Sequence, residues 1–453
     1  MPGSYHFKIE RDIPVIAEAD VLVVGGGPGG LGAAVMAARA GAKVILAERF
    51  GILGGMAAVG EVHPFMPNHC DTKGAKANDS WDHSNETCMD RPVFREWELA
   101  IASYLPPSLR EKALSDPEGC SHEARSVAKD AAALAAEDLC LKAGVKILYH
   151  HTLVDAPVKG GRIECAVFNS KSGFVAIKAK AYVDSSGDGD LAALAGAPSE
   201  FGGPSGSCQP MTTCFKLSNL DPSRMPPLSR INELYAKAKA EGVLECPREN
   251  VLPFPTFNAD TIHFNTTRVV GRSAIDGLAL SEAELEGHKQ VKQYLAWLRS
   301  SVPGYENAQL KSMAQHIGIR ESRRIKGLAW LTREDFMKRS KFADGIARCN
   351  YPIDIHSATG SGTELVHMPH QEYFEIPYGC IVPLGVGNLL VGSRCISVDH
   401  SVHSSMRVMP VVCSVGQAAG MAAAMSAASG KEPAKLDGME VRAKLKEQGA
   451  WLG

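Results

Sequence analysis

Residues 19–30, ADVLVVGGGPGG, decide the fold of this 453-residue chain. An apolar run leads into the glycines, and residues 31–42, LGAAVMAARAGA, have the alanine-rich composition of a buried helix. The next segment, residues 43–48, is KVILAE and is typical of a second strand that ends in an acidic residue. A strand, a glycine turn, a helix and a strand in this order predict the first unit of a Rossmann-like fold.

The glycine turn has the GxGxxG spacing of a dinucleotide-binding site, with Gly25, Gly27 and Gly30 at the three positions. The first glycine allows a tight turn, the second lets a pyrophosphate approach the backbone, and the third lets the helix pack on the strand. Glu48 lies where a carboxylate can accept hydrogen bonds from an adenosine ribose. The segment therefore predicts dinucleotide binding.

The overall composition is that of a globular chain, with 45% apolar residues, 22% charged residues and a formal net charge of -2. This composition excludes disorder as the main state. The sequence has no long run of basic or acidic residues, so we expect no nucleic-acid partner. The 12 cysteines are scattered without a CxxC pair, and the chain does not begin with the apolar core of a signal peptide. We therefore expect reduced thiols and a cytoplasmic protein.

Residues 408–428 form an uncharged stretch that is long and apolar enough to be considered as a membrane span. Much of the stretch is alanine and glycine, and Gly416 and Gly420 have GxxxG spacing. Alanine and glycine supply little transfer free energy, and Gln417 is polar. We therefore predict a buried helix and no membrane partner.

Further motifs follow in a fixed order: LGGM at 53–56, GEVHPFM at 60–66, DSSGDGD at 184–190, HFNTTRV at 263–269, GIRESRRIKG at 318–327, and a closing segment at 389–420 that begins LLVGSRC. Together with the first glycine turn, they make the chain resemble FAD-dependent oxidoreductases of the glutathione-reductase structural type. The resemblance is strongest to proteins related to the flavin domain of heterodisulfide reductase. It spans roughly residues 19–430 and implies FAD as the cofactor.

The resemblance implies a set of FAD-binding residues in several places along the chain. Residues of the first glycine turn hold the pyrophosphate: Gly25, Gly27, Gly29 and Gly30. Residues after the second strand hold the adenosine ribose or lie along the flavin: Glu48, Arg49, Gly54, Gly55 and Met56. A backbone contact to the adenine and a second turn near the cofactor involve Val154, Ser186, Gly187 and Asp188. The closing strand and helix start surround the ribityl chain and pyrimidine edge with Gly392, Arg394, Met406 and Arg407.

The expected fold class is α/β, with a discontinuous Rossmann-like FAD-binding domain and an inserted α+β substrate domain. We place the first part of the FAD-binding domain at 15–200, the substrate domain at 201–379, the closing part at 380–430 and a C-terminal tail at 431–453. Residues 67–92 are polar and loop-like, residues 121–143 predict a helix, and residues 174–180 and 181–184 predict two short strands before the second glycine turn. Ser281 and Glu284 predict a capping box that opens a helix ending near Arg299.

Four residues are candidates for the substrate chemistry: His63, His400, His403 and Arg320. His63 follows the flavin-side glycines, and His400 and His403 precede the helix expected to face the flavin, so each is a candidate general base. Hydrogen-bonded structure is the alternative for His63, and a metal pair is the alternative for HSVH at 400–403. Arg320 could clamp a carboxylate, or could belong to an ion-pair network.

Other polar residues leave alternatives open. Asn265 and Arg268 lie on one expected strand, where alternation sends them to opposite faces and only one can point to the flavin. Asp354 and His356 resemble an acid–base pair. The alternating acids of 184–190 suggest calcium, but the bidentate glutamate of an EF-hand loop is missing, so we predict no metal.

These observations predict an enzyme, an FAD-dependent oxidoreductase that transfers a hydride between a small organic substrate and flavin N5. The sequence shows no second GxGxxG with a trailing acid, so electrons must pass to or from the substrate, dioxygen or an external donor or acceptor. The alternatives are a flavin monooxygenase, an electron-transfer subunit of a larger redox complex, and a flavin-binding protein without catalysis. A homo-oligomer is also possible.

Overall fold

A computed structural model describes residues 10, 12–66, 68–71, 86–114, 128–204, 206–369 and 371–453. Its centre is a seven-stranded sheet in the order β5-β2-β1-β10-β9-β6, with β21 also paired to β10. The strands of this sheet are β1 (Val15–Val24), β2 (Val44–Ala47), β5 (Lys146–Leu148), β6 (Thr152–Asp155), β9 (Ala166–Ser170), β10 (Gly173–Asp184) and β21 (Leu389–Val391). The strand–turn–helix–strand prediction and the α/β class are confirmed.

The sheet is parallel where the two glycine turns leave it. β1 pairs in parallel with β2 and β10, and β10 pairs in parallel with β21, whereas β9 runs antiparallel to both β10 and β6. The second half of β1, Val21–Val24, is fully buried, as expected for a strand covered on both faces. The carboxyl ends of β1 and β10 therefore place their turns side by side, with the Ser185 amide donating to the carbonyl of Val24 at 2.8 Å.

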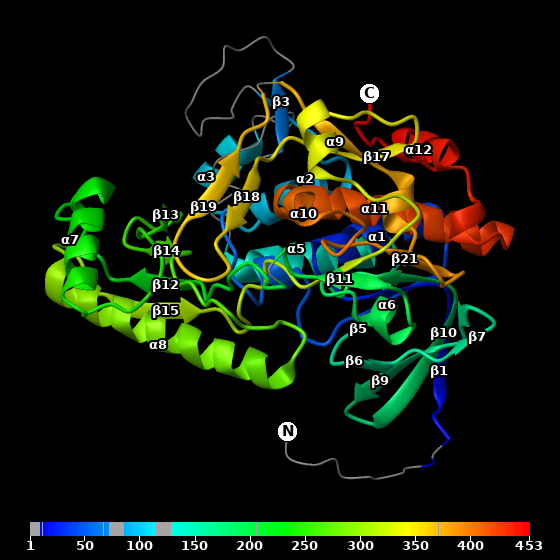
Figure 1. Ribbon diagram of the computed structural model, residues 1–453, viewed down its shortest axis with the longest axis horizontal. Coiled ribbons are helices and arrows are strands. Elements are labelled where there is room, and N and C mark those ends of the chain that lie inside the picture. The colour runs from blue at the N-terminus through cyan, green and yellow to red at the C-terminus, as the bar shows by residue number, and fades with distance from the viewer. Residues whose placement is uncertain are drawn as a thin grey trace.

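Helices cover this sheet and continue around it (Figure 1). They are α1 (Pro28–Arg39), α2 (Val93–Ala102), α3 (Pro107–Leu114), α5 (Lys129–Lys142), α6 (Asp190–Leu194), α9 (Arg333–Lys338), α10 (His400–Met406), α11 (Met409–Ser429) and α12 (Gly438–Glu447). Short 3-10 helices are η1 (Gly55–Ala57), η2 (Tyr378–Ile381) and η3 (Pro433–Lys435).

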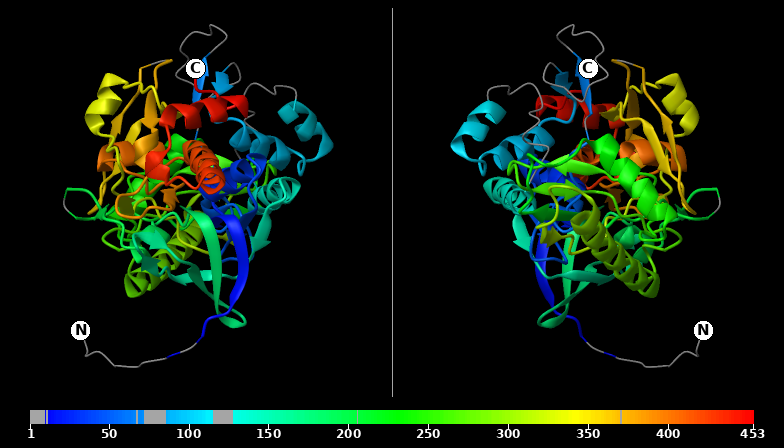
Figure 2. Two further views of the ribbon diagram at one scale, coloured as in Figure 1. Left: turned by 90° about the vertical axis from the view of Figure 1, so that its right-hand side faces the viewer. Right: turned by 90° about the vertical axis from the view of Figure 1, so that its left-hand side faces the viewer.

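A second sheet, in the order β13-β14-β12-β15, has a hydrophobic cluster of its own. It consists of β12 (Phe215–Ser218), β13 (Pro253–Pro255), β14 (Ile262–Phe264) and β15 (Gln309–Met313), with helices α7 (Leu228–Ala240) and α8 (Gly277–Ser301). In the right-hand view of Figure 2, which shows the molecule from the left-hand side of Figure 1, α7 and α8 face the viewer. We call the segment 211–319, which contains this sheet and its helices, the second unit.

The remaining strands form two-stranded pairs. They are β3 (His69–Asp71) with β4 (Glu86–Cys88), β7 (Val158–Lys159) with β8 (Arg162–Ile163), β11 (Ser199–Phe201) with β16 (Arg323–Ile325), β17 (Gly345–Cys349) with β20 (Phe374–Pro377), and β18 (Ile353–His356) with β19 (Thr363–Val366). Buried residues between Ile325 and Val382 belong to the same hydrophobic cluster as the central sheet. The domain boundaries stay a prediction, and this packing favours a substrate domain that ends before Arg323.

Three details differ from the sequence-based expectations. α8 begins at Gly277 instead of at Ser281, because the Asp276 side chain caps it by accepting from the Ala279 amide at 2.8 Å. The Glu284 carboxylate accepts instead from the Ile317 amide at 2.7 Å. Residues 174–184, expected as two short strands, belong to the single strand β10. Of the expected loop and helix, residues 67, 72–85 and 121–127 lie outside the described residues.

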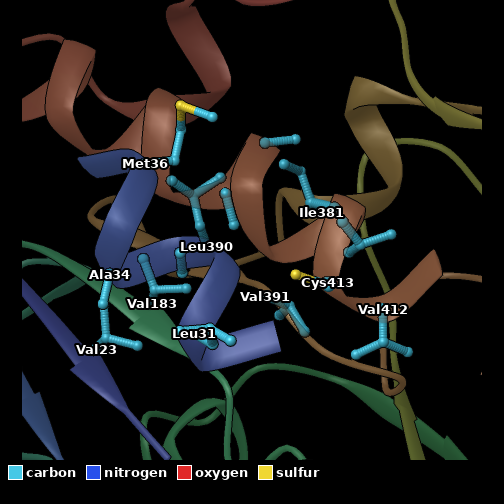
Figure 3. Packing of buried hydrophobic residues seen from close by; sticks show 14 of the residues in the cluster. Val23, Leu31, Ala34, Met36, Val183, Ile381, Leu390, Val391, Val412 and Cys413 are labelled. Atoms are coloured by element: carbon cyan, nitrogen blue, oxygen red, sulfur yellow. The ribbon is translucent and has the colours of Figure 1, made fainter. Parts of the chain in front are cut away.

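Helices α1 and α11 cross with their backbones in contact. A Cβ atom on Gly416 would lie 2.0 Å from the carbonyl oxygen of Gly29, and one on Gly420 would lie 2.1 Å from that of Ala33. Leu31 and Ala34 of α1 and Cys413 of α11 share the core beside Val183 (Figure 3). By length and composition α11 could cross a membrane, but 89% of its most apolar window is buried inside the protein. The prediction of a buried helix is confirmed.

Because of this contact, we expect that α11 cannot accommodate even one added methyl group at Gly416 or Gly420 without a shift of the helices. Gly416→Ala and Gly420→Ala should each lower the free energy of unfolding by about 3 kcal/mol, the upper part of the range for overpacked cores. Gly277→Ala is the control, because its added Cβ would lie within 4 Å of no atom beyond its chain neighbours and the backbone of its own helix. Thermal unfolding followed by circular dichroism measures the effect. Wild-type melting temperatures for both α11 variants would contradict the described helix contact.

Candidate active site

One cavity of about 380 Å³ runs from the first glycine turn to the second unit. At one end its wall includes residues of the two glycine turns and the closing segment: Gly25, Gly27, Gly29, Glu48, Ser186, Gly187, Asp188 and Arg394. At the other end it includes residues of the second unit and of two nearby segments: Arg248, Leu252, Phe254, Asn265, Arg320, Tyr351, Asp354, His356 and Arg407. We call these the turn end and the arginine end.

The glycines of the first turn have different structural roles. Gly25 has a φ of +97°, and an added Cβ would lie 2.4 Å from the carbonyl oxygen of Ser185. A Cβ on Gly30 would lie 1.8 Å from the carbonyl oxygen of Gly25, so this glycine lets α1 pack on the turn. A Cβ on Gly27 would approach only the Cα of Gly55, at 3.7 Å. The backbone at Gly27 is therefore open towards the cavity.

The amino terminus of α1 gives the turn end a preference for anions. Gly27 is the N-cap residue, and no side chain caps the helix. Amides of the first helical turn have no partner within the helix, and the helix dipole adds partial positive charge at this end. Gly27, Pro28 and Gly29 lie in the cavity wall. A phosphate group placed there would receive hydrogen bonds from the backbone.

Glu48 is held beside this turn by backbone amides. Its Oε2 accepts from the Gly26 amide at 2.6 Å, and its Oε1 accepts from the Phe50 amide at 2.9 Å. Burial raises the pKa of the Glu48 carboxyl, while these two amides and Arg49 lower it. The Arg49 guanidinium lies 3.0 Å from Nε2 of His316 and above the ring of Phe50. The second strand thus fixes a carboxylate at the cavity wall, where the sequence predicted a ribose ligand.

The second glycine turn is fixed by hydrogen bonds of its acids. Asp184 accepts from the amide and hydroxyl of Ser186 and from the Ala192 amide, and burial raises the pKa of its carboxyl to about 6. The carboxylate of Asp188 pairs with Arg394 at 2.6 Å, and Asp190 pairs with Arg323 at 2.9 Å. These pairs explain the alternating acids without a metal.

The structure places most of the predicted FAD-binding residues in the cavity wall. Four of the turn and closing positions lie behind it or away from it: Gly30, Gly54, Gly392 and Met406. Gly392 shapes the wall indirectly, because its carbonyl accepts from the Ser185 hydroxyl at 3.0 Å. Val154 lies on β6, is 39% exposed and does not line the cavity, because β6 pairs with β9 beyond β10.

Among the predicted catalytic residues, the structure brings only Arg320 to the cavity. The His400 Nδ1 lies 2.7 Å from the buried Glu321 carboxylate, so the ring of this partly exposed histidine contacts Glu321 instead of the cavity. His403 is fully buried within α10, and burial lowers the pKa of its imidazole to about 3. His63 is also buried, against His263, with 5.5 Å between ring centroids. We therefore correct the candidate set by removing these three histidines.

Several residues of the arginine end come from segments without a site motif. Arg248 lies before β13, and Tyr351 lies before β18. The sequence offered Asn265 as one of two residues that could face the flavin and Asp354–His356 as an acid–base pair, and all three line the cavity. Arg268 lies behind the wall and pairs with Glu249 at 3.1 Å. The expected strand ends earlier, at Phe264, so Asn265 and Arg268 lie in the segment after β14, and strand alternation is not what separates them.

The hairpin β18–β19 holds the acid–base pair next to α10 (Figure 1). The Asp354 amide donates to the Ser404 hydroxyl at 3.1 Å. Nδ1 of His356 lies 3.2 Å from the Arg268 guanidinium, which is always a donor, so this nitrogen accepts. The proton of the neutral ring then lies on Nε2, which is 3.5 Å from Oδ2 of Asp354. Burial and four surrounding arginines hold the pKa of His356 far below its usual range.

With this geometry in view, comparison with known proteins decides the family. A model of the family described as FAD dependent oxidoreductase matches residues 20–445. The chain belongs to this family. As a family member it is an enzyme, an FAD-dependent oxidoreductase, and its cofactor is FAD, as predicted. No curated protein sequence matches the chain.

Similarity of this FAD-dependent oxidoreductase to solved structures is distant. A geranylgeranyl bacteriochlorophyll reductase-like protein from Thermoplasma acidophilum is 14% identical, with a TM-score of 0.45 and coverage of 95% of this chain and 84% of that chain. A p-nitrophenol 4-monooxygenase from Pseudomonas putida is 13% identical, with a TM-score of 0.38 and coverage of 69% and 70%. A myxobacterial chondrochloren halogenase is 12% identical, with a TM-score of 0.40 and coverage of 95% and 78%. Likenesses this distant carry no information about the substrate.

The residues of the turn end fit FAD. The open backbone at Gly27 and the uncapped start of α1 suit a pyrophosphate, and the buried Glu48 carboxylate is adjacent. Nε of Arg394 is buried without a hydrogen-bond partner, as is Nε of Arg407 at the arginine end, and this is expected where a polar ligand completes the wall. The roles of single residues in binding FAD stay predictions.

Proposed function

We propose that this FAD-dependent oxidoreductase transfers a hydride between a small organic substrate and the flavin. The observation that carries the proposal is the single cavity, which joins the FAD-binding turns to the polar and apolar wall of the second unit. When bound, FAD would supply two-electron chemistry at N5 of its ring system. A substrate at the arginine end would lie in the same cavity and between the two units, which is a usual place for an active site.

At the turn end, the chain itself would bind and orient the cofactor. We propose that the amides at the start of α1 bind the pyrophosphate and that Glu48 binds the ribose. Arg394 donates to Oδ1 of Asp188, which also accepts from the Ser322 hydroxyl, so Arg394 would stay fixed beside the second turn. Such prior fixation lowers the entropic cost of binding.

At the arginine end, Asp354 is the carboxylate in the wall, and we propose that it takes a proton from the substrate. The Tyr351 hydroxyl lies 3.4 Å from its Oδ2, and His356 Nε2 lies 3.5 Å from the same oxygen. Burial raises the pKa of Tyr351, so its hydroxyl stays protonated and can donate. Both neighbours therefore donate towards the Asp354 carboxylate and hold it in place to take and keep the proton, without a change of charge on the histidine.

We also propose the finer family relation, to the glutathione-reductase structural type and to the flavin domain of heterodisulfide reductase. The order of the motifs supports it, as does the antiparallel pair β9–β6 that precedes β10 in a parallel sheet. We further propose that the enzyme exchanges electrons with an external donor or acceptor and acts in the cytoplasm.

Anaerobic mixing of the purified protein with candidate substrates tests the function. A substrate of the proposed class should bleach the flavin absorption without any added protein. Asp354→Asn should slow this bleaching by about 100-fold or more, the usual contribution of a general base, without loss of FAD. Bleaching only by reduced nicotinamide, with oxygen consumption, would favour a monooxygenase. Reduction only in the presence of a partner protein would favour an electron-transfer role within a larger complex.

A further inference from the structure

We propose that the substrate of this site is an organic anion whose carboxylate or phosphate group binds the guanidinium groups of Arg248 and Arg320. The inference rests on the proposed function, because it names the substrate class for the same cavity. It comes from positive charge in the wall that the protein itself leaves without a counter-ion.

Arg248 carries the argument furthest. Arg248 is only 7% exposed and lies in the cavity wall. Its Nε is buried without a hydrogen-bond partner, and it forms no ion pair with any residue that the structure describes. A buried guanidinium stays charged, and a buried charge without a partner costs several kcal/mol in general. We therefore expect a buried unpaired guanidinium group at a place where a bound ligand supplies the negative charge.

Arg320 lies in the same wall and also lacks a carboxylate. Its Nη1 donates to the carbonyl of Pro210 at 2.7 Å and to the hydroxyl of Thr212 at 2.5 Å, and both acceptors are neutral. Burial, with Arg407 and Arg248 nearby, lowers the pKa of Arg320 to about 9. The side chain is therefore held in place by neutral groups while its charge is left for a ligand.

The charges at the arginine end do not cancel. The wall contains three guanidinium groups, those of Arg248, Arg320 and Arg407, against the single carboxylate of Asp354. Arg407 approaches Asp354 to 3.8 Å. Arg268, behind the wall, has Glu249 as its partner at 3.1 Å. Two positive charges, on Arg248 and Arg320, thus remain for an anion from outside the chain.

The position of these two arginines separates them from the cofactor. Arg407 immediately precedes α11, where the family resemblance places the pyrimidine edge of the flavin, so the inference does not depend on it. Arg248 and Arg320 come instead from the end of the cavity formed by the second unit and the segment after it. Leu252 and Phe254 line the same wall. The site therefore suits an anion with an apolar part, and guanidinium groups bind carboxylate or phosphate through paired hydrogen bonds.

Thermal unfolding of the FAD-loaded protein tests this inference with matched probes. The probes are acetate, benzoate, succinate and phenyl phosphate, with acetamide and benzamide as neutral counterparts. We expect at least one acid to raise the melting temperature of the wild type while the amides do not. Benzoate and phenyl phosphate distinguish a carboxylate from a phosphate ligand. Arg248→Gln should lose the shift, and Arg272→Gln, at an exposed arginine paired with Glu282, should keep it.

Without a probe, Arg248→Gln should melt at the wild-type temperature or above it, because the variant removes a buried unpaired charge. Two results would overturn the inference: none of the four acids stabilises the wild type more than the two neutral amides do, or Arg248→Gln responds to the acids as the wild type does. The experiment needs no turnover. Anion-dependent stabilisation without any substrate that bleaches the flavin would support the inference and contradict only the proposed hydride transfer.

Discussion

Gly27→Val is expected to fold normally and to purify with less than about a tenth of the wild-type FAD content, which corresponds to a loss of ~1.4 kcal/mol or more in binding. In the folded chain an added Cβ at Gly27 meets only the Cα of Gly55, at 3.7 Å. The protein can therefore accommodate the side chain, but the side chain occupies the place where a pyrophosphate approaches the backbone. Absorbance of the released flavin against protein concentration measures the loss.

Two other glycines provide contrasts for this variant. Gly277→Val is the control for the added side chain, because its Cβ meets no atom within 4 Å. Gly29→Val should instead impair folding itself, since its Cβ would lie 2.0 Å from the carbonyl oxygen of Gly392. A folded Gly27→Val variant that retains the full FAD content would show that the pyrophosphate does not lie at this turn.

Arg320→Met is expected to lower kcat/KM for flavin reduction by at least about 100-fold, or ~2.7 kcal/mol, while FAD stays bound. The reason is that Arg320, just after the second unit, lies in the wall of the arginine end and holds a charge that no carboxylate of the described chain neutralises. Rapid-mixing measurements with the best substrate from the anaerobic screen give this ratio.

Arg320→Lys should recover part of the loss, because lysine keeps the charge but cannot make the paired contact of a guanidinium group. Arg272→Met, at an exposed position on the second unit, is the matched control and should behave as the wild type. If Arg320→Met retains its FAD and reduces it at the wild-type rate, Arg320 does not bind the substrate.

The turn end was predictable from the sequence because its determinants are local. Gly25, Gly27 and Gly30 act through the backbone of a few consecutive residues, and Glu48 is fixed by the strand that follows. Chain order alone therefore predicts the turn, the helix and the carboxylate. The GxxxG spacing of α11 was visible too, but its partner α1 lies almost the whole chain away, so the sequence could not show why the glycines are needed.

The arginine end was less predictable because it forms only on folding. Arg248 comes from one segment and Tyr351 and His356 from another far along the chain, and only the folded chain shows that Arg248 is buried without a partner. The histidines before α11 misled for a related reason. They lie in a short helix of their own, α10, which ends at Arg407 before α11 begins. In this separate helix the His403 side chain is buried in the core.

The visible absorption spectrum of the purified protein, followed by acid precipitation and analysis of the supernatant, tests the central claim that the cavity binds FAD. The account predicts flavin absorption bands and release of intact FAD into the supernatant. A colourless protein that also fails to take up added FAD would contradict the account.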